Sequence, residues 1–428
     1  MKQLTDIPPA RVAALDALRD VLAGDGLGTD VQAGLDSVLK ASGLDGRDIG
    51  LTTEIVYGYL RLKGRIEAIL SRFLKAPEKL PGELHLILGV AAYEILFLDR
   101  VPTYASVNWA VDAVRTLISP NLAGLTNAVL RRTGDLGNEV HEKSFYGQPD
   151  VPATLARFYS CPVWIVSLWL EHFGPERTEH YLRAQVSPPA LGMTVPMEHP
   201  EHDRIVVELA RHPGLIEQSG PGFAFPAGTQ LASFSGDLTL KSGSFAARQA
   251  LMAMEPETWG EPIWDACCGR GGKTRVLLEL GMRVVSSDVH RGRIRALQAE
   301  LPGADAHEAS VFDGAPMEAV PETILLDAPC SGLGVLSRRP DTKWRRREAD
   351  LPELVALQAQ MLDAAAANLA PGGRIVYLTC TLNRDENEGQ VQAFLQRNSA
   401  FSLESEWTTS PASPLKEFFY GVRLKGAV

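Results

Sequence analysis

Hydrophobic residues recur at helical spacing over the first third of the chain. One helical face between positions 84 and 98 consists of Leu84, Ile87, Leu88, Ala91, Ile95 and Leu98. The same spacing predicts helices over residues 11–22, 104–118 and 122–132, and Pro and Gly mark the joins between them. Residues 1–140 are therefore predicted to form an all-α domain.

The pattern changes twice further along the chain. Residues 134–152 are polar and broken, as expected of a linker, and residues 153–235 mix short helices with short apolar runs. From residue 236, apolar runs at 262–265, 283–288, 323–327 and 374–380 alternate with helical segments at 274–280, 294–301 and 354–369. This alternation predicts a doubly wound, mostly parallel sheet. We expect three domains: 1–140 all-α, 141–235 linker and small α+β, and 236–428 Rossmann-like α/β.

Composition narrows the class of protein. The chain has 428 residues, of which 45% are hydrophobic, so it is expected to bury sizeable cores. Its net charge of -10 gives no overall attraction to nucleic acid, so RNA binding would need local basic patches. No apolar run is long enough to suggest a membrane span. Five scattered cysteines without a CxxC pair favour the reducing cytoplasm over a disulfide framework or a structural zinc site, and nothing demands more than a monomer.

Four chemically distinctive residues follow the predicted strands. They are Asp265, Asp288, Asp327 and Cys380. Open α/β sheets bind ligands at the carboxyl ends of their strands, where these side chains are predicted to lie. This edge of the sheet is therefore the candidate functional site.

A glycine-rich turn follows the first of these strands. Gly269, Gly271 and Gly272 would let a ligand approach the backbone, and the following helix offers free N–H groups to an anion. A P-loop is not supported, because Cys267 stands where that motif needs its first glycine. Asp288, about 20 residues further on, is placed to bind a ribose diol. A structural glycine turn and a solvated aspartate remain the alternatives.

Two cysteines and a basic run complete the candidate chemistry. Asp327 is followed by Cys330, and the last predicted strand ends at Cys380. Single cysteines on strands are usually inert core residues, but two at one ligand-binding edge suggest nucleophilic chemistry. Residues 337–347 form a run of Arg and Lys around Trp344, which suits RNA phosphates and base stacking, or alternatively a solvated helix start.

These motifs resemble those of a known family. Residues 327–332 (Asp-Ala-Pro-Cys-Ser-Gly) and Thr379-Cys380 resemble the two cysteine motifs of the RNA (cytosine-5) methyltransferases. Arg338, Pro340, Lys343, Trp344 and Glu386-Asn387 match further parts of the family pattern. Residues 55–61, 102–108 and 125–131 resemble a NusB-type RNA-binding domain. A NusB-like domain joined to such a methyltransferase is the arrangement of the RsmB (Sun/Fmu) family, which methylates small-subunit (16S) ribosomal RNA. With this resemblance, the all-α domain (1–140) and the small α+β domain within 141–235 are both expected to bind RNA.

The resemblance implies a mechanism. Cys380 would attack carbon 6 of a cytosine, Asp327 would support protonation of the ring near N3, and Cys330 would assist loss of the carbon-5 proton. The product would be 5-methylcytidine, and the base would come from single-stranded RNA or be flipped out. The methyl donor would be S-adenosylmethionine, without a metal. The residues expected to bind it are Cys267, Cys268, Gly269, Arg270, Gly271, Gly272, Lys273, Asp288, Arg293, Ser310, Asp313 and Asp327. The residues expected to bind RNA are Arg338, Arg339, Lys343 and Trp344.

Several positions depart from the family pattern. Arg270 stands where the family usually has Pro, and Cys268-Gly269 where it has Ala-Ala. Ser310 takes the place of an acidic residue that contacts adenine, with Asp313 nearby as a substitute. Two alternatives therefore stay open. One is an RNA-binding assembly protein without activity, and the other is an enzyme of the same class that acts on transfer RNA.

Overall fold

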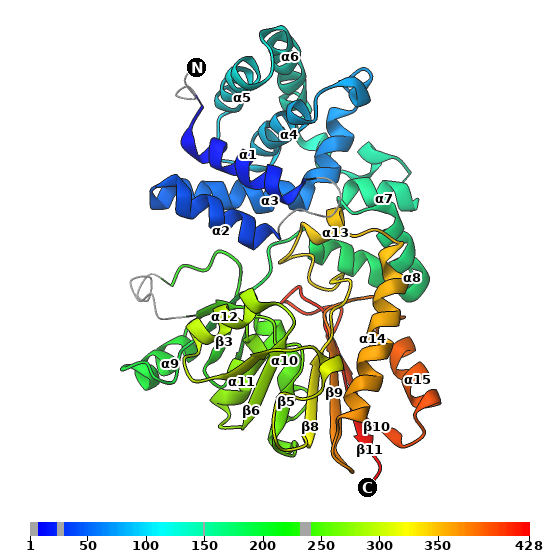
Figure 1. Ribbon diagram of the computed structural model, residues 1–428. Helices are drawn as coiled ribbons and strands as arrows, with labels where there is room; N and C mark the ends of the chain where they lie inside the picture. Colours follow the sequence, from blue (N-terminus) through cyan, green and yellow to red (C-terminus); the bar gives the residue numbers. More distant parts are fainter. Residues whose placement is uncertain (1–6, 24–29, 149, 232–240) are drawn as a thin grey trace. The chain divides into compact units, whose positions relative to one another are not determined.

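The computed structural model describes residues 7–23, 30–148, 150–231 and 241–428 (Figure 1). The chain divides into two compact units. The helical unit comprises residues 1–187 together with 339–346, and the α/β unit comprises residues 188–338 and 347–428. The three predicted domains remain a prediction, but residues 141–235 do not stay together: 141–187 belong to the helical unit and the rest to the α/β unit.

The helical unit is built from nine α-helices and short 3-10 turns within the described residues. The helices are α1 (Pro9–Val21), α2 (Val31–Ser42), α3 (Gly46–Leu70), α4 (Gly82–Phe97), α5 (Thr103–Leu117), α6 (Ala123–Gly134), α7 (Pro152–Phe158), α8 (Val163–Gln185) and α13 (Thr342–Arg345). The 3-10 turns are η2 (Pro77–Lys79), η3 (Pro120–Leu122), η4 (Gly137–His141) and η5 (Lys143–Tyr146). Asp30 and Asp45 cap α2 and α3 by accepting backbone N–H bonds. The predicted helices at 11–22, 84–98, 104–118 and 122–132 are confirmed to within two residues at each end.

Helix α4 is buried on more than the predicted face. Leu84, Ile87 and Leu88 are fully buried, as expected, but Val90 and Ala92 on other sides of the helix are buried too. The reason is that α4 packs against α3, α5 and α6, so it has no extended solvent face along its middle.

A carboxylate inside this core ties three helices together. Glu94 on α4 is completely buried and accepts hydrogen bonds from Arg11 Nε at 2.9 Å, Ser106 Oγ at 2.7 Å and Trp109 Nε1 at 2.8 Å. A buried charge is tolerated when it is paired and hydrogen-bonded in this way. Glu94 thereby fixes α1 and α5 against α4.

The predicted linker at 134–152 is partly ordered packing. Val140 and Tyr146, in the turns η4 and η5, are buried against α3. Arg65 on α3 donates to Tyr146 Oη at 3.0 Å and also to Val140 O, and Tyr146 Oη donates to Val140 O at 2.8 Å. A few buried residues among polar ones produce no periodic signal, so the sequence shows only a polar stretch.

The α/β unit contains two sheets. The smaller has the order β2-β3-β1-β4 and is formed by β1 (Leu191–Thr194), β2 (Glu217–Ser219), β3 (Gly222–Phe225) and β4 (Lys241–Gly243), with α9 (His202–Ala210). All three of its strand pairs are antiparallel. A Cβ at Gly192 would lie 2.3 Å from Gly243 O, so β1 and β4 approach closely only because position 192 is glycine.

The larger sheet has seven strands in the order β10-β11-β9-β8-β5-β6-β7. They are β5 (Ile263–Asp265), β6 (Val284–Asp288), β7 (Asp305–Glu308), β8 (Thr323–Asp327), β9 (Arg374–Thr379), β10 (Phe401–Thr408) and β11 (Tyr420–Gly426). Its helices are α10 (Phe245–Met252), α11 (Gly272–Glu279), α12 (Arg291–Glu300), α14 (Asp350–Ala367) and α15 (Glu388–Arg397), with 3-10 turns η6 (Pro256–Thr258) and η7 (Val311–Asp313). Strands β5 to β9 pair in parallel, which confirms the predicted doubly wound sheet.

Alternate residues of the central strands enter two separate cores. Ile324 and Leu326 of β8 pack with residues of α14 and α15, whereas Leu325 packs with residues of α10 and α11. Helices therefore cover both faces of the sheet, which explains why its central strands are continuous apolar runs. The strand order reverses between β5 and β8, and such a switch point is where ligands bind in open α/β sheets.

Among the described residues, no single helix is long and apolar enough to cross a membrane. Only the bent pair α7 and α8, taken together, passes that test of length and composition.

Candidate active site

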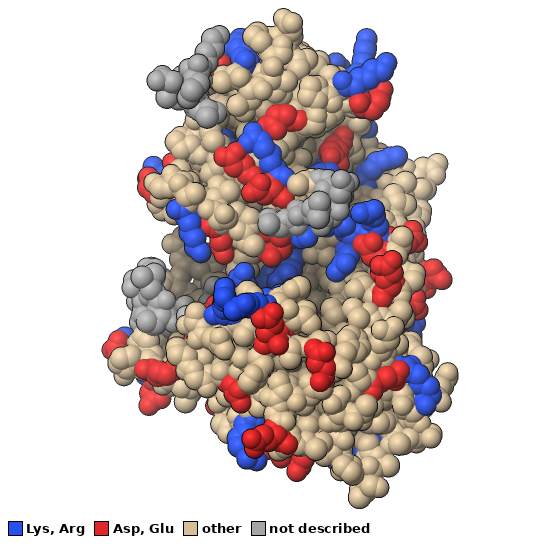
Figure 2. Space-filling model, viewed as in Figure 1, with Lys and Arg blue, Asp and Glu red and all other residues tan. Residues whose placement is uncertain are grey.

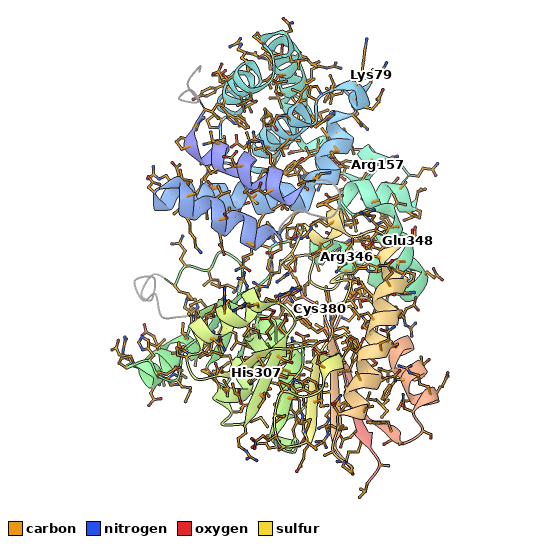
Figure 3. The ribbon with its side chains drawn as sticks, viewed as in Figure 1. Lys79, Arg157, His307, Arg346, Glu348 and Cys380 are labelled. Atoms are coloured by element: carbon orange, nitrogen blue, oxygen red, sulfur yellow. The ribbon has the colours of Figure 1, made fainter. Side chains whose placement is uncertain are left out.

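The sequence-predicted aspartates and cysteines lie at one edge of the large sheet. Asp265 ends β5, Asp288 ends β6 and Asp327 ends β8, while Cys380 follows β9 directly. Parallel pairing brings these ends together, with Asp265 opposite Leu325 and Asp327 opposite Leu378. Figure 3 labels Cys380 at this end of the strands. The site thus straddles the switch point between β5 and β8.

The turn after β5 forms a cradle from backbone groups. Gly269 and Gly271 have φ angles of 57° and 81°, which non-glycine residues rarely adopt. The N–H of Cys268 donates to Ser287 O at 2.9 Å, which fixes the turn to β6. A Cβ at Gly269 would meet nothing within 4 Å, so the space above the turn is open. Helix α11 begins at Gly272, and no side chain caps its first N–H groups, which are the kind of donors that bind an anion.

Asp288 is anchored beside the cradle. Its carboxylate accepts the N–H of Gly269 at 3.1 Å and of His290 at 2.8 Å, and Arg293 contacts it at 3.3 Å. Arg293 is half-exposed, so its long contact can give way to a ligand hydroxyl, and a carboxylate has lone pairs for about four donors. The arrangement can therefore accept a diol.

Ser310 and Asp313 are engaged with each other's backbone. Ser310 Oγ accepts the N–H of Phe312 at 3.3 Å, and Asp313 Oδ2 accepts the N–H of Ser310 at 3.1 Å. This capping box holds η7 and leaves the Phe312 ring 51% exposed beside it. The expected adenine contact of Ser310 or Asp313 remains a prediction.

Two of the predicted donor-binding cysteines have inert thiols. Burial raises the pKa of Cys267 and Cys268 above the ordinary thiol value, so both stay protonated at neutral pH. Cys268 packs with Ile294, Leu297 and Ala306. The thiols therefore contribute shape to the turn.

A cavity of about 400 Å³ opens beside the cradle. One wall comes from the turn and the end of β8, and the other from β1 and the start of α10. Its lining includes Cys268, Gly269, Arg270, Gly272, Lys273 and Asp327, and across from them Gly192–Thr194 and Gly243–Phe245. Six sequence-predicted residues thus share one cavity, and β1 and α10 supply a wall that sequence reasoning did not identify.

Lys273 and Asp327 form an ion pair within this cavity. Lys273 Nζ lies 2.5 Å from Asp327 Oδ2. Burial alone would lower the pKa of Lys273, but the Asp327 carboxylate outweighs it and raises that pKa, so the lysine stays charged. The Asp327 side chain is 32% exposed, which leaves it a face for a ligand.

Cys330 and Cys380 meet across the ends of β8 and β9. Their sulfur atoms are 3.4 Å apart, and the N–H of Cys380 also points to Cys330 Sγ at 3.4 Å. The contact with Cys380, together with burial, raises the pKa of Cys330 well above the ordinary thiol value. The Cys330 thiol is therefore held protonated while Cys380 lies against it.

A buried carboxylate joins the loops that carry these cysteines. Glu386 is completely buried and accepts from Ser331 N at 2.8 Å, Gln358 Nε2 at 2.9 Å and Asn383 Nδ2 at 3.1 Å. Gln358 Nε2 also donates to Pro329 O at 3.0 Å. The sequence matched Glu386 only to a family pattern and missed Gln358, whose one signal is a lone amide on an otherwise apolar helix face.

The basic run at residues 337–347 is not uniformly exposed to solvent. The structure corrects the role predicted for Lys343, which was to bind RNA. Lys343 is 1% exposed, and its ammonium group donates to Arg61 O at 2.9 Å and Gln185 Oε1 at 2.6 Å. Burial lowers its pKa to about 7. Its amine is thus inside the helical unit and out of reach of an RNA phosphate.

The neighbouring residues of the run differ in exposure. Trp344 is partly buried and donates from Nε1 to Leu60 O at 2.7 Å. Arg338 is paired with both oxygens of buried Glu417 at 2.8 and 2.9 Å. Arg339 is exposed, so of the four predicted RNA contacts it is the one presented most openly.

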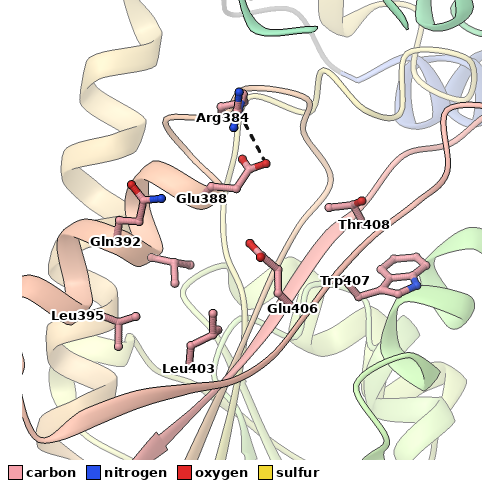
Figure 4. A pocket seen from close by; sticks show the side chains of 9 residues that line it. Arg384, Glu388, Gln392, Leu395, Leu403, Glu406, Trp407 and Thr408 are labelled. Carbon is pink, nitrogen blue, oxygen red and sulfur yellow. Dashed lines mark ion pairs between the residues drawn. The ribbon is translucent and has the colours of Figure 1, made fainter.

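A second hollow of the α/β unit lies away from these residues. It has a volume of about 500 Å³ between α15 and β10 and contains Arg384, Glu388 and Glu406 (Figure 4). Glu406 already accepts a hydrogen bond from Tyr420 at 2.7 Å. None of the sequence-predicted site residues line it, and within the described residues no cluster of His, Cys, Asp and Glu could hold a metal ion.

Comparison with known proteins identifies the family. The family profile of the 16S rRNA methyltransferases RsmB/F matches residues 251–417, and that of the NusB family matches residues 8–135. A probable ribosomal RNA small subunit methyltransferase B from Synechocystis is 31% identical over 94% of this chain and 92% of its own. Ribosomal RNA small subunit methyltransferase B from Vibrio cholerae is 32% identical over 96% and 94%.

Solved structures share the fold. The crystal structure of PH0851 superposes with a TM-score of 0.74 at 21% identity, covering 98% of this chain and 99% of that one. A methyltransferase homologue from Pyrococcus horikoshii gives a TM-score of 0.53 at 20% identity, over 64% of this chain and 97% of its own. These matches confirm the resemblance seen in the cysteine motifs and the helical domain. The chain belongs to the RsmB/F family of 16S rRNA methyltransferases, enzymes whose methyl donor is S-adenosylmethionine, and carries a NusB domain in its N-terminal part.

Proposed function

We propose that the protein methylates carbon 5 of a cytosine in small-subunit ribosomal RNA through a covalent adduct with Cys380. The observation that carries this proposal is the pair of thiols 3.4 Å apart beside Asp327, at the same sheet edge as the glycine cradle. The RNA substrate is inferred from relatives named ribosomal RNA small subunit methyltransferase B.

The cradle is chemically suited to S-adenosylmethionine, which supplies an electrophilic methyl group on a sulfonium when bound. The start of α11 suits a carboxylate, and Asp288 suits ribose hydroxyls. The departures from the family pattern leave these features in place. Gly269 and Gly271 keep their turn, and the side chain of Arg270 is exposed at the cavity, outside the turn.

A thiolate nucleophile is needed because carbon 5 of cytosine is poorly nucleophilic. Addition of Cys380 to carbon 6 breaks the aromatic ring and turns carbon 5 into an enamine-like nucleophile. Cys380 suits this role because it directly follows β9, at the same sheet edge as the glycine cradle, with Cys330 Sγ 3.4 Å from its own sulfur. The negative charge that develops on the ring must be met by a proton near N3.

Asp327 is placed to stabilise the cytosine ring when it is protonated near N3. The ammonium of Lys273 fixes one of its oxygens at 2.5 Å, so the carboxyl group is oriented before substrate arrives. After methyl transfer, carbon 5 carries a proton that must leave to restore the ring. Once Cys380 is bonded to carbon 6, it no longer exerts the contact that raises the pKa of Cys330. Cys330 gives its own proton to solvent and then takes the carbon-5 proton as a thiolate. The electrons of that C–H bond restore the ring double bond, and the bond between carbon 6 and sulfur breaks to release Cys380 as a thiolate.

The test is methyl transfer from labelled S-adenosylmethionine to unmodified small-subunit rRNA, followed by digestion to nucleosides. We expect label in 5-methylcytidine with the wild type, none with Cys380→Ala, and wild-type label with Cys161→Ala, a buried cysteine of the helical unit. If only transfer RNA became labelled, the substrate would be transfer RNA and not rRNA. Donor binding without label on any RNA would overturn the proposal and leave an RNA-binding protein.

A further inference from the structure

A hollow in the helical unit combines aromatic and cationic side chains. It is lined by residues of α3, η4, η5, α7 and the end of α8, and it has a volume of about 660 Å³. Its lining includes the cations Arg65, Lys143 and Arg183 and the rings of Phe158 and Tyr159. The volume falls within the about 300–1,000 Å³ typical of pockets for small ligands or single nucleotides. We call this the aromatic–basic hollow.

No comparison assigns a role to this hollow. The NusB family match ends at residue 135, whereas all its lining residues except Arg65 lie between 141 and 186. Those residues include the stretch whose sequence predicts only a linker. Apart from Arg65, the hollow is therefore separate in sequence both from the NusB domain and from the cysteine motifs.

The cations are held in place before any ligand binds. Lys143 Nζ and Arg183 Nη2 both contact Glu179 Oε1, at 2.6 and 2.8 Å, and Tyr159 Oη donates to the same oxygen at 2.6 Å. Burial would raise the pKa of Glu179, but these hydrogen bonds hold it at about 2. One carboxylate thus serves two cations. The hollow is also lined by Glu142, so the three cations Arg65, Lys143 and Arg183 face two carboxylates, and the group keeps one net positive charge.

The exposure of these groups suits an incoming anion. The Arg183 side chain is 67% exposed and that of Lys143 27%, so both have donors directed to solvent. Phe158 is partly exposed and has Arg65 stacked 4.6 Å from its ring centre. Aromatic and guanidinium planes next to cations are what single-stranded RNA binds, through base stacking and phosphate contacts.

Such local sites matter because the net charge of the protein gives no overall attraction to nucleic acid. The net charge is -10, and Figure 2 shows Lys and Arg side chains interspersed with Asp and Glu over the visible face. Lys343, one of the four predicted RNA contacts after Cys330, is buried. RNA affinity must therefore come from small groups of cations elsewhere.

We propose that the aromatic–basic hollow binds one nucleotide of a single-stranded segment of the substrate rRNA, with its base on Phe158 and its phosphate on Arg183 and Lys143. This inference rests on the proposed function, because it takes rRNA as the substrate. It adds a second RNA contact, which holds the rRNA by a segment other than the methylated cytosine.

The experiment compares Arg183→Gln with Arg177→Gln in the full-length protein. Arg177 is exposed on the same helix, α8, but does not line the hollow, so it is the matched control. Binding of labelled, unmodified small-subunit rRNA is measured over a range of salt concentrations. We expect Arg183→Gln to reduce the slope of log K against log salt by about 0.7, the value for one phosphate contact to a single strand. Arg177→Gln should keep the wild-type slope, and Arg183→Lys should restore most of it.

A stacking contact gives a second readout. Phe158→Leu keeps apolar volume but removes the ring, and is expected to weaken rRNA binding about 5- to 100-fold. Methyl transfer should show a raised KM for rRNA with kcat unchanged, because the cysteine loops are untouched.

The outcomes separate this inference from the proposed function. Failure of the wild type to bind or methylate rRNA would overturn the proposed function. If the wild type methylates rRNA, but Arg183→Gln and Phe158→Leu bind rRNA with the same affinity and salt dependence as Arg177→Gln, only the proposal for the hollow would be overturned. Normal binding of Arg183→Gln to free rRNA but weakened binding to a particle with ribosomal proteins would make the hollow a protein contact, which also contradicts the inference.

Discussion

Replacing Glu386 by glutamine should both destabilise the α/β unit and slow catalysis. The carboxylate accepts two N–H donors at Oε2, from Ser331 and Gln358, and one at Oε1, from Asn383. An amide has a single acceptor oxygen, so at least one of these buried donors must face an NH2 group. In the better orientation of the substituted amide, its oxygen still accepts hydrogen bonds from Ser331 and Gln358, and the hydrogen bond from Asn383 is lost.

The cost follows from these contacts. One buried donor left unpaired costs about 1–3 kcal/mol, and two hydrogen bonds to a charge become bonds to a neutral amide, which loses roughly 1 kcal/mol each. Glutamine is neutral, so the variant no longer buries a charge, and this offsets part of the lost stability. We therefore expect a loss of about 2–4 kcal/mol in the free energy of unfolding. For a unit of this size that lowers Tm by roughly 5–10 °C.

The matched control is Asp385→Asn, which removes the same charge from the exposed neighbouring residue. Thermal unfolding and single-turnover methyl transfer are measured for both variants. Because Glu386 holds the backbone at Ser331, next to Cys330, we expect Glu386→Gln to slow methyl transfer about 10- to 100-fold at a temperature where it remains folded. If the two variants shared the Tm and the rate of the wild type, the positioning role of Glu386 would be refuted.

Three further substitutions, one of them with a control variant, test other parts of the account. Lys343→Met should leave the salt dependence of rRNA binding unchanged because the ammonium group is buried; a shallower slope would show that it reaches a phosphate. Burial raises the pKa of Asp265 to about 7, so its contribution to stability is full below about pH 4 and is lost as the pH rises through 7. Asp265→Asn should flatten the profile of Tm against pH over that window, and an unchanged profile would contradict the raised pKa. Gly271→Ala places Cβ 2.7 Å from Leu297 Cγ at a φ of 81°, and should cost about 1–3 kcal/mol of stability and weaken donor binding in calorimetry. Gly272→Ala meets open space and should keep the stability of the wild type, so equal losses in both would argue against the steric explanation.

The centre of the α/β sheet was predictable because its strands are buried on both faces. Residues 323–327 and 374–379 read as apolar runs since α10 and α11 cover one face and α14 and α15 the other. The edge strands lack this signal. In β7 only Ala306 is buried, and most side chains of β10 are exposed, so no hydrophobic pattern marks either strand.

The candidate site was predictable where strand ends carry chemically distinctive residues. Asp327, Cys330 and Cys380 needed only the topology of a parallel sheet to bring them together. Lys343 could not be placed in this way, because the acceptors that allow its burial are Arg61 O and Gln185 Oε1, which are distant in sequence. A basic run looks the same in sequence whether its lysine is buried or solvated.

The central claim is that Cys380 is the nucleophile and Cys330 assists release. The most direct measurement incubates Cys330→Ala with S-adenosylmethionine and unmodified small-subunit rRNA, and then resolves the mixture under denaturing conditions. We predict a protein–RNA adduct that survives denaturation, and peptide mass spectrometry should find the nucleotide on Cys380. An adduct located on another residue, or methylation of the rRNA by Cys380→Ala at the wild-type rate, would contradict the account.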